Sequence, residues 1–183
     1  MKRISLLLLP ALLLAAASPL FAQEKQRISP HETVTEKVAG VEVSIVYGRP
    51  YTKDPKSGEM RKIWGTLVPY GKVWRMGADE ATQMTTSDAI VIAGTTVPAG
   101  TYSLYLLPQD ETSAKLIINK QTGQWGTKYD EAQDLVRVDL KKETIKTSAD
   151  QFTIGITETD AAGVMNFSWD STQYSVAFTP SKG

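Results

Sequence analysis

The chain contains no cysteine and a single histidine among its 183 residues. Without cysteine, a disulfide framework, lipid attachment through a thiol and nucleophilic attack by a thiolate are all excluded. The single histidine, His31, is a narrow basis for a serine–histidine–acid triad, and the chain has no G-x-S-x-G sequence. A zinc site built on His31 and carboxylates would fall short of the usual ligand set. We therefore expect His31 at the surface, no metal ion and no cofactor.

Positive charge is not in excess either. The chain carries 20 basic and 20 acidic residues, and its first 22 residues include two basic residues and no acid. No stripe of Lys and Arg alternates with aromatic residues, and the densest basic stretch, residues 53–62, also contains Asp54 and Glu59. A protein that binds a nucleic-acid duplex normally carries a basic footprint. We therefore expect no nucleic-acid partner.

Long hydrophobic runs are absent beyond residue 22. Residues 1–22 begin with two basic residues, continue with an apolar run over 6–17, and end in the small residue Ala22. This order predicts a secretory signal peptide cleaved near Ala22, and thus a secreted or periplasmic protein. An uncleaved membrane anchor is the alternative, but the run is short for a hydrocarbon core about 30 Å thick. We expect no membrane span in residues 23–183, and the sequence indicates no particular oligomeric state.

Residues 23–183 have the pattern of β structure almost throughout. Alternation over residues 41–47 places every second side chain, from Val41 to Tyr47, on one face. Residues 89–108 are two apolar runs around Gly94, Pro98 and Gly100, which indicates a hairpin. Five more apolar stretches follow, at 114–120, 135–140, 151–156, 164–169 and 174–178. We predict a single-domain, jelly-roll-like β-sandwich of about 8–10 short antiparallel strands. Helix is confined to one or two short turns, at 130–135 and after Gly77.

Residues 70–83, "YGKVWRMGADEATQ", are the first candidate site. If the stretch up to Arg75 is extended, Gly77 can turn the chain so that Glu80 approaches Arg75. One interpretation is an Arg75–Glu80 pair that fixes a corner between strands. The other is a polar pocket in which Arg75, Asp79 and Glu80 hold an anionic or hydroxyl-rich ligand. Neighbours such as Asp79 and Glu80 rarely face the same atom, so glycoside hydrolysis would need Glu80 and a distant acid.

Residues 123–130, "GQWGTKYD", are the second candidate site. Glycines flank Trp125, and Tyr129 follows four residues later. A tryptophan on such a loop can offer its flat face to a sugar or an aliphatic ligand, or it can close the open end of the core. Arg49, which precedes a proline at the end of a predicted strand, can line the same pocket as Arg75 or lie on the surface.

Four blocks of sequence resemble a known family when they are taken in order. They are "GRP" (48–50), "LVPYGKVWRMGADEAT" (67–82), "VPAGTYSLY" (97–105) and "NKQTGQWGTKYD" (119–130). Together they resemble the DUF2911 family, exported bacterial proteins whose function has not been established. The resemblance implies Asn where this chain has Asp79, and often Ser where it has Gly48. It supplies no activity, ligand or catalytic residue.

The residues favour a protein that binds a small polar or glycan-like ligand of the cell envelope without transforming it. The alternatives are a hydrolase that uses Glu80 with a distant carboxylate, and a structural or partner-binding envelope protein. No residue is assigned a catalytic role. The candidate ligand-binding residues are Arg75, Asp79, Glu80, Trp125, Tyr129 and Arg49.

Overall fold

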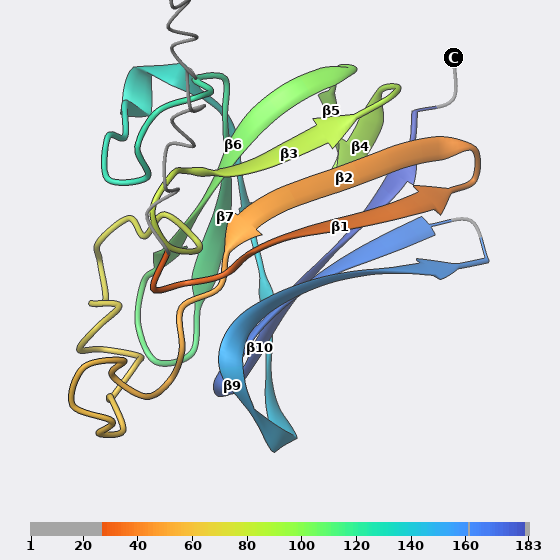
Figure 1. The fold of residues 1–183 in the computed structure, drawn as a ribbon. Helices are drawn as coiled ribbons and strands as arrows, with labels where there is room; N and C mark the ends of the chain where they lie inside the picture. Colours follow the sequence, from red (N-terminus) through yellow and green to blue (C-terminus); the bar gives the residue numbers. More distant parts are fainter. Residues whose placement is uncertain (1–26, 161, 182–183) are drawn as a thin grey trace, which may run out of the picture.

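A computed structural model describes residues 27–160 and 162–181, and the chain there forms two antiparallel sheets (Figure 1). The larger sheet has the strand order β1 (His31–Val38), β2 (Val41–Gly48), β3 (Thr82–Thr86), β6 (Gly100–Pro108), β7 (Ala114–Asn119), β8 (Asp134–Asp139). The smaller sheet has the order β5 (Thr95–Val97), β4 (Ile90–Ile92), β10 (Ala162–Pro180), β9 (Lys141–Thr159). This arrangement confirms the predicted all-β sandwich, while the predicted signal segment, residues 1–22, lies outside the described residues.

The core lies between the two sheets and follows the alternation of the strands. On β2, Val43 and Ile45 are fully buried, as the period of two predicts, and they belong to one hydrophobic cluster with Phe167 and Trp169 of β10. Side chains one residue further along each strand are more exposed. The burial of one face and the exposure of the other is the expected behaviour of an antiparallel sheet in a sandwich.

The last two strands are longer than the sequence predicts. The stretches 164–169 and 174–178 belong to one strand, β10, which pairs with β9 from Ala162 to Ser175 and with β4 from Phe178 to Pro180. The register shifts near Asp170, whose φ of 52° lies in the left-handed region. A bulge of this kind bends a strand without ending it. Turn-like residues in the middle of β9 and β10 therefore mark a bend, where the sequence predicts a break.

The sequence predicts a hairpin over residues 89–108, and the structure forms one only over the first part of this range, where β4 pairs with β5. Ala93 and Gly94 have φ of 47° and 80°, which are the positive angles that a tight two-residue turn between β4 and β5 requires. After β5, the chain passes through Pro98 and enters β6 at Gly100, where φ is 151°. Because β5 and β6 belong to different sheets, this short connection carries the chain from the smaller sheet to the larger one.

Two local expectations need correction. The predicted helical segment 130–135 is a single 3-10 turn, η1 (Glu131–Gln133), after which β8 begins, and no helix forms at 79–83. The first strand, β1, begins at His31, which pairs with Gly48 of β2. No helix within 27–160 or 162–181 has the length and apolar character needed to cross a membrane.

Candidate functional site

The site is built around a loop, residues 75–81, that leaves the larger sheet and rejoins it. Trp74 pairs with Leu106 of β6, and Thr82 pairs with Leu104, so seven residues stand opposite one residue of β6, Tyr105. Within this segment, which we call the Arg75–Ala81 loop, two residues other than glycine have positive φ, 48° and 63°. Such angles are unusual outside glycine and indicate that tertiary contacts hold the loop in place.

Backbone hydrogen bonds from the β7–β8 connection hold one side of the loop. The amide of Gly126 donates to the carbonyl of Asp79 at 3.0 Å, and the amide of Ala81 donates to the carbonyl of Gln124 at 3.1 Å. Glu80 and Trp125 form the isolated bridge between these two bonds. The two sequence segments that were predicted as separate candidate sites are therefore joined as a short ladder.

Two glycines allow the close approach of backbone on which the loop depends. A Cβ atom at Gly48 would lie 2.5 Å from the carbonyl oxygen of Ala78, and a Cβ atom at Gly126 would lie 2.5 Å from Cδ of Arg75. Real Cβ atoms do not approach other atoms this closely, so only glycine fits without rearrangement at either position. All four sequence blocks that carry the family resemblance meet at this loop, since Tyr105 of the third block faces it.

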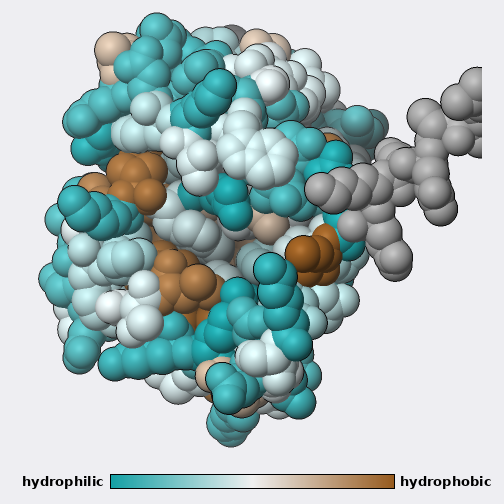
Figure 2. All heavy atoms as spheres, turned by 60° about the vertical axis from the view of Figure 1, so that its left-hand side comes forward, coloured by the Kyte–Doolittle hydropathy of each residue, from teal (hydrophilic) through white to brown (hydrophobic). Residues whose placement is uncertain are grey.

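A cavity of about 430 Å³ lies on one side of the loop. Its walls include five aromatic side chains, Tyr51, Trp74, Tyr105, Tyr129 and Trp169. The long connection between β2 and β3 and the β7–β8 connection border the cavity, and both lie on the left-hand side of Figure 1. Figure 2 brings this side forward and shows hydrophobic groups around a hollow in the surface. We call this cavity the aromatic pocket.

Two arginines line the aromatic pocket, and neither forms an ion pair with an acid in the part of the chain that the structure describes. Nε of Arg75 donates to the carbonyl of Gly77 at 3.2 Å, and Arg61 donates to the carbonyls of Tyr51 and Thr52. Within the described ranges, neither guanidinium forms an ion pair with a carboxylate, and no acidic side chain lines the pocket. The other arginines that the structure describes do have acidic partners: Arg27 pairs with Asp79 and Glu80, Arg49 with Glu32, and Arg137 with Glu131 and Asp134.

Tyr129 is a fixed part of the pocket wall. Its hydroxyl donates to Oδ2 of Asp134 at 2.6 Å and accepts from Nη2 of Arg137 at 2.9 Å. Burial and the adjacent carboxylate raise the pKa of the Tyr129 hydroxyl well above its ordinary value, so the group stays neutral. The ring lies 4.8 Å from that of Tyr105, centroid to centroid, at 60°. These contacts fix the position of the Tyr129 ring in the pocket wall.

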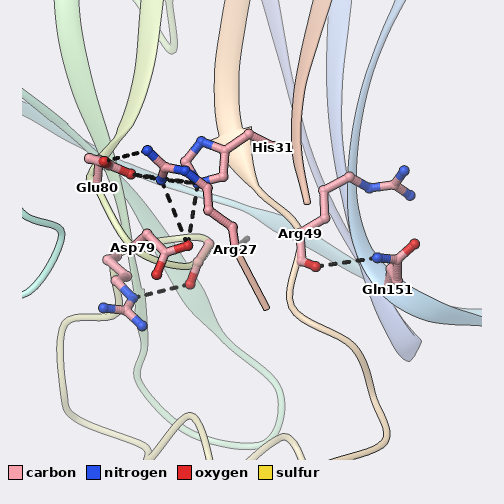
Figure 3. Close-up of polar contacts among 8 residues, drawn as sticks. Arg27, His31, Arg49, Asp79, Glu80 and Gln151 are labelled. Carbon is pink, nitrogen blue, oxygen red and sulfur yellow. Dashed lines mark hydrogen bonds and ion pairs between the residues drawn. The ribbon is translucent and has the colours of Figure 1, made fainter. Parts of the chain in front are cut away.

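A cluster of ionic side chains lies on the other side of the loop (Figure 3). The guanidinium of Arg27 binds both carboxylate oxygens of Glu80, with Nη2 2.9 Å from Oε1. Its Nη1 atom also lies 2.9 Å from Nε2 of His31 and 3.9 Å from Oδ2 of Asp79. We call these four residues the ionic cluster. The hydrogen bonds from Arg27 lower the pKa of Glu80 to about 2, and a smaller cavity of about 220 Å³ opens beside it.

The structure corrects two expectations about the acids of the loop. Asp79 and Glu80 do face the same atoms, because both carboxylates contact Arg27 and His31. Side chains of neighbours alternate in an extended chain, but the left-handed conformation of Asp79, with φ of 63°, breaks the alternation. The predicted Arg75–Glu80 pair is also absent: Arg75 lines the aromatic pocket, and Glu80 turns to the opposite side of the loop.

Of the three remaining predicted site residues, only Tyr129 belongs to either site. Tyr129 lines the aromatic pocket together with Arg75. Arg49 lies outside the pocket lining, where it pairs with Glu32 and donates to Thr153. The Trp125 residue is 47% exposed, so it does not close the end of the core, and it is not part of the pocket lining either.

Two members of the ionic cluster, Arg27 and His31, were not among the predicted site residues. Their spacing from Asp79 and Glu80 carries no signal, since 53 residues separate Arg27 from Glu80. The link is structural: His31 pairs with Gly48, and the bare backbone of Gly48 packs against Ala78 of the loop. These two contacts place the start of β1 beside Asp79 and Glu80.

Among the described residues, His31, Asp79 and Glu80 form a group that could hold a metal ion. One donor atom from each lies within 4.8 Å of the other two. The set contains one imidazole nitrogen and two carboxylate oxygens, all from side chains at the surface or half-buried. Such a mixed nitrogen and oxygen set suits a divalent transition-metal ion.

The fold and site define a class: a two-sheet β-sandwich with an aromatic pocket and an ionic cluster on either side of one loop. The chain belongs to the family described as "Protein of unknown function (DUF2911)", whose model matches residues 29–178. The family match thus covers the described core, including the loop, both arginines of the aromatic pocket and three of the four residues of the ionic cluster, while Arg27 lies just before it. The chain has no significant match among curated proteins or among solved structures.

Proposed function

We propose that the protein binds a small organic anion in the aromatic pocket without transforming it. One observation carries this proposal: Arg61 and Arg75 line an aromatic cavity, and no carboxylate in the described part of the chain pairs with either. An arginine that has only carbonyl partners keeps donors for a carboxylate or a phosphate group of a ligand. A negatively charged ligand would supply the ion-pair partner that Arg61 and Arg75 lack among the described residues.

The shape and chemistry of the walls support a ligand with a flat, weakly polar body. A cavity of about 430 Å³ falls in the range of small-molecule sites, about 300–1,000 Å³. Tyr and Trp rings offer apolar faces on which a sugar ring or another compact ring can lie. An acidic sugar therefore fits both the arginines and the aromatic walls. The predicted export of the protein agrees with a glycan-like ligand of the cell envelope.

Binding has more support than hydrolysis by Glu80. A glycosidase needs one carboxylic acid with a raised pKa, whereas Arg27 lowers the pKa of Glu80 to about 2. Glu80 also lies outside the lining of the aromatic pocket. The acid nearest to it in the chain, Asp79, shares the same basic partners, so the two carboxylates do not stand across a substrate. The loop geometry thus gives Glu80 an ionic partner in place of a substrate.

The proposal is tested by comparing acidic and neutral sugars of the same size. We expect glucuronate to raise the thermal unfolding temperature, while glucose does not. A ligand at one hundred times its Kd stabilises a protein by about 2.7 kcal/mol, which such a measurement detects easily.

Two variants then test whether glucuronate binds in the aromatic pocket. Arg75→Gln should lower the affinity for glucuronate about tenfold or more, because a hydrogen bond to a charged group is worth about 1.5–3 kcal/mol. Arg49→Gln, outside the pocket lining, is the matched control and should leave the affinity unchanged. Equal responses to glucose and glucuronate, or an unchanged affinity in Arg75→Gln, would contradict the proposal.

A further inference from the structure

We propose that His31, Asp79 and Glu80 form a binding site for a divalent transition-metal ion, and that the guanidinium of Arg27 competes with the metal for it. The site lies on the opposite side of the Arg75–Ala81 loop from the aromatic pocket, and the proposal does not depend on what that pocket binds. It assigns a role to the only histidine of the chain.

The distances between the donor atoms fit a metal ion. Nε2 of His31 lies 3.4 Å from Oδ2 of Asp79 and 3.5 Å from Oε2 of Glu80. Zinc binds nitrogen and oxygen ligands at about 2.0–2.2 Å in a tetrahedron, which places two ligands about 3.4 Å apart. Three protein donors would fill three corners and leave the fourth for water or another ligand, as in zinc sites that keep one open position.

Arg27 shows that this position accepts positive charge. Its Nη1 atom lies among all three donors, 2.9 Å from His31, 3.9 Å from Asp79 and in an ion pair with Glu80 (Figure 3). Within the cluster, the carboxylates of Asp79 and Glu80 carry two negative charges, and the guanidinium of Arg27 balances only one of them. A divalent ion would balance both, so the cluster has more capacity for positive charge than Arg27 supplies.

An oxygen atom in the cluster points independently to a missing partner. Oδ2 of Asp79 is shielded from solvent and accepts no hydrogen bond from any described residue. A shielded carboxylate oxygen without a hydrogen bond is expensive, because it has lost water and gained only the more distant charges around it. A metal ion bound at this oxygen would remove that penalty. Neither Arg27, at 3.9 Å, nor the imidazole of His31, at 3.4 Å, forms a hydrogen bond with it.

The backbone holds the three donors in place without help from Arg27. His31 begins β1 and pairs with Gly48, while Glu80 bridges to Trp125 and Asp79 accepts a backbone bond from Gly126. Arg27 precedes the first strand. The metal ligands therefore sit on paired backbone, and the competing cation comes from the segment before the sheet, so removing the arginine should leave the site assembled.

Zinc is the appropriate probe for this set of donors. Imidazole nitrogen favours Zn²⁺ and its neighbours among the transition metals. Calcium takes six to eight oxygen ligands, and magnesium keeps several waters in an octahedron, so neither gains from the histidine. We expect Zn²⁺ to bind more tightly than Mg²⁺ or Ca²⁺.

The test measures Zn²⁺ binding to the untagged protein by titration calorimetry. We expect one site per chain and a threefold to fivefold tighter Kd in Arg27→Ala, about the worth of an exposed charge pair. His31→Gln should weaken binding at least about tenfold, since even outer partners of metal ligands contribute that much. Arg49→Ala, which removes a different ion pair near β1, is the matched control and should not change the Kd.

A second readout separates the site from scattered surface binding. Because the chain has one histidine, the NMR signals of its imidazole ring belong to His31 alone. These signals should shift on addition of Zn²⁺ in the wild-type protein and at lower concentrations in Arg27→Ala. Zinc binding that leaves the ring signals unmoved would overturn the proposal. So would a Kd that Arg27→Ala fails to tighten, or no binding by either protein at millimolar zinc.

Discussion

The two sides of the Arg75–Ala81 loop differ in how their charges are balanced. On one side, Arg75 and Arg61 face an aromatic cavity without an acid among the described residues. On the other, Asp79 and Glu80 face Arg27 and His31. One turn of backbone thus separates opposite charges that lie within five residues of each other in the sequence. The aromatic pocket depends on packing and keeps its cations available, whereas the ionic cluster depends on charge and brings both of its acids against Arg27 and His31.

Replacement of Trp169, on the pocket side of the loop, should lower the stability of the protein more than any other substitution at these two sites. Its indole ring, 1% exposed, stacks on Trp74 with 5.4 Å between centroids and meets Phe152 at 6.0 Å. Trp169→Ala should lower the free energy of unfolding by about 3–5 kcal/mol, measured by urea denaturation. The half-exposed Trp125 is the control, since Trp125→Ala should cost about 0.5 kcal/mol or less. Equal losses in the two variants would refute a pocket wall built from the core.

A methyl group at Gly48 should disturb both sides at once, because this glycine packs under the loop that they share. In Gly48→Ala the new Cβ would meet three backbone atoms of Ala78 at 2.5–3.1 Å, and backbone cannot move aside easily. We expect a loss of about 1–3 kcal/mol in urea denaturation, typical of overpacking. Gly155→Ala has open space around its Cβ and should show no loss. A neutral Gly48→Ala would mean that the loop tolerates displacement.

Loss of Arg27 should affect the ionic cluster and leave the aromatic pocket unchanged. The Arg27 side chain is 44% exposed, so Arg27→Ala should lower the free energy of unfolding by about 0.2–1 kcal/mol. The difference between wild type and variant should shrink in 1 M salt, which screens exposed charges beyond about 3 Å. Trp169→Ala should keep its deficit in the same salt. A deficit of Arg27→Ala that ignores salt would show that the arginine acts through packing.

Protonation of Glu80 at low pH should produce the smallest change in the free energy of unfolding. The pKa of Glu80 falls from its ordinary 4.5 to about 2 in the folded protein, because Arg27 binds the carboxylate. The stabilisation is therefore complete above about pH 4.5 and disappears as the pH falls toward 2. Since the Glu80 side chain is 44% exposed, we expect a few tenths of a kcal/mol. Thermal unfolding between pH 5 and pH 2 should show a smaller loss in Glu80→Gln than in wild type, and parallel curves would contradict this assignment.

Much of the fold can be read from the sequence because its signals are local. The alternation from Val41 to Tyr47 reports burial on one face, and Gly94 marks a turn that needs a positive φ. The break predicted within β10 is wrong for a physical reason. A bulge near Asp170 lets turn-forming residues bend a paired strand, and only the partner strand β9 shows that pairing continues.

The candidate site could be located from the sequence but not assembled from it. The loop and the Trp125 segment were both singled out, and the structure joins them through Glu80. The sorting of Arg75 and Glu80 to opposite sides depends on the positive φ of Asp79, which no spacing rule reveals. The contribution of His31 depends on strand pairing across the sheet. The expectation that no metal binds was argued from ligand counting along the chain, and the zinc titration tests it directly.

The pairing of His31 with Gly48 has a consequence for how the protein reaches its native state. β1 is an edge strand of the larger sheet, and a slip of one residue along β2 would turn every β1 side chain to the opposite face. Only the native alignment brings the imidazole to the two acids. The ionic cluster can therefore form only after distant parts of the chain have docked, so it reports that the edge strand has found its correct register.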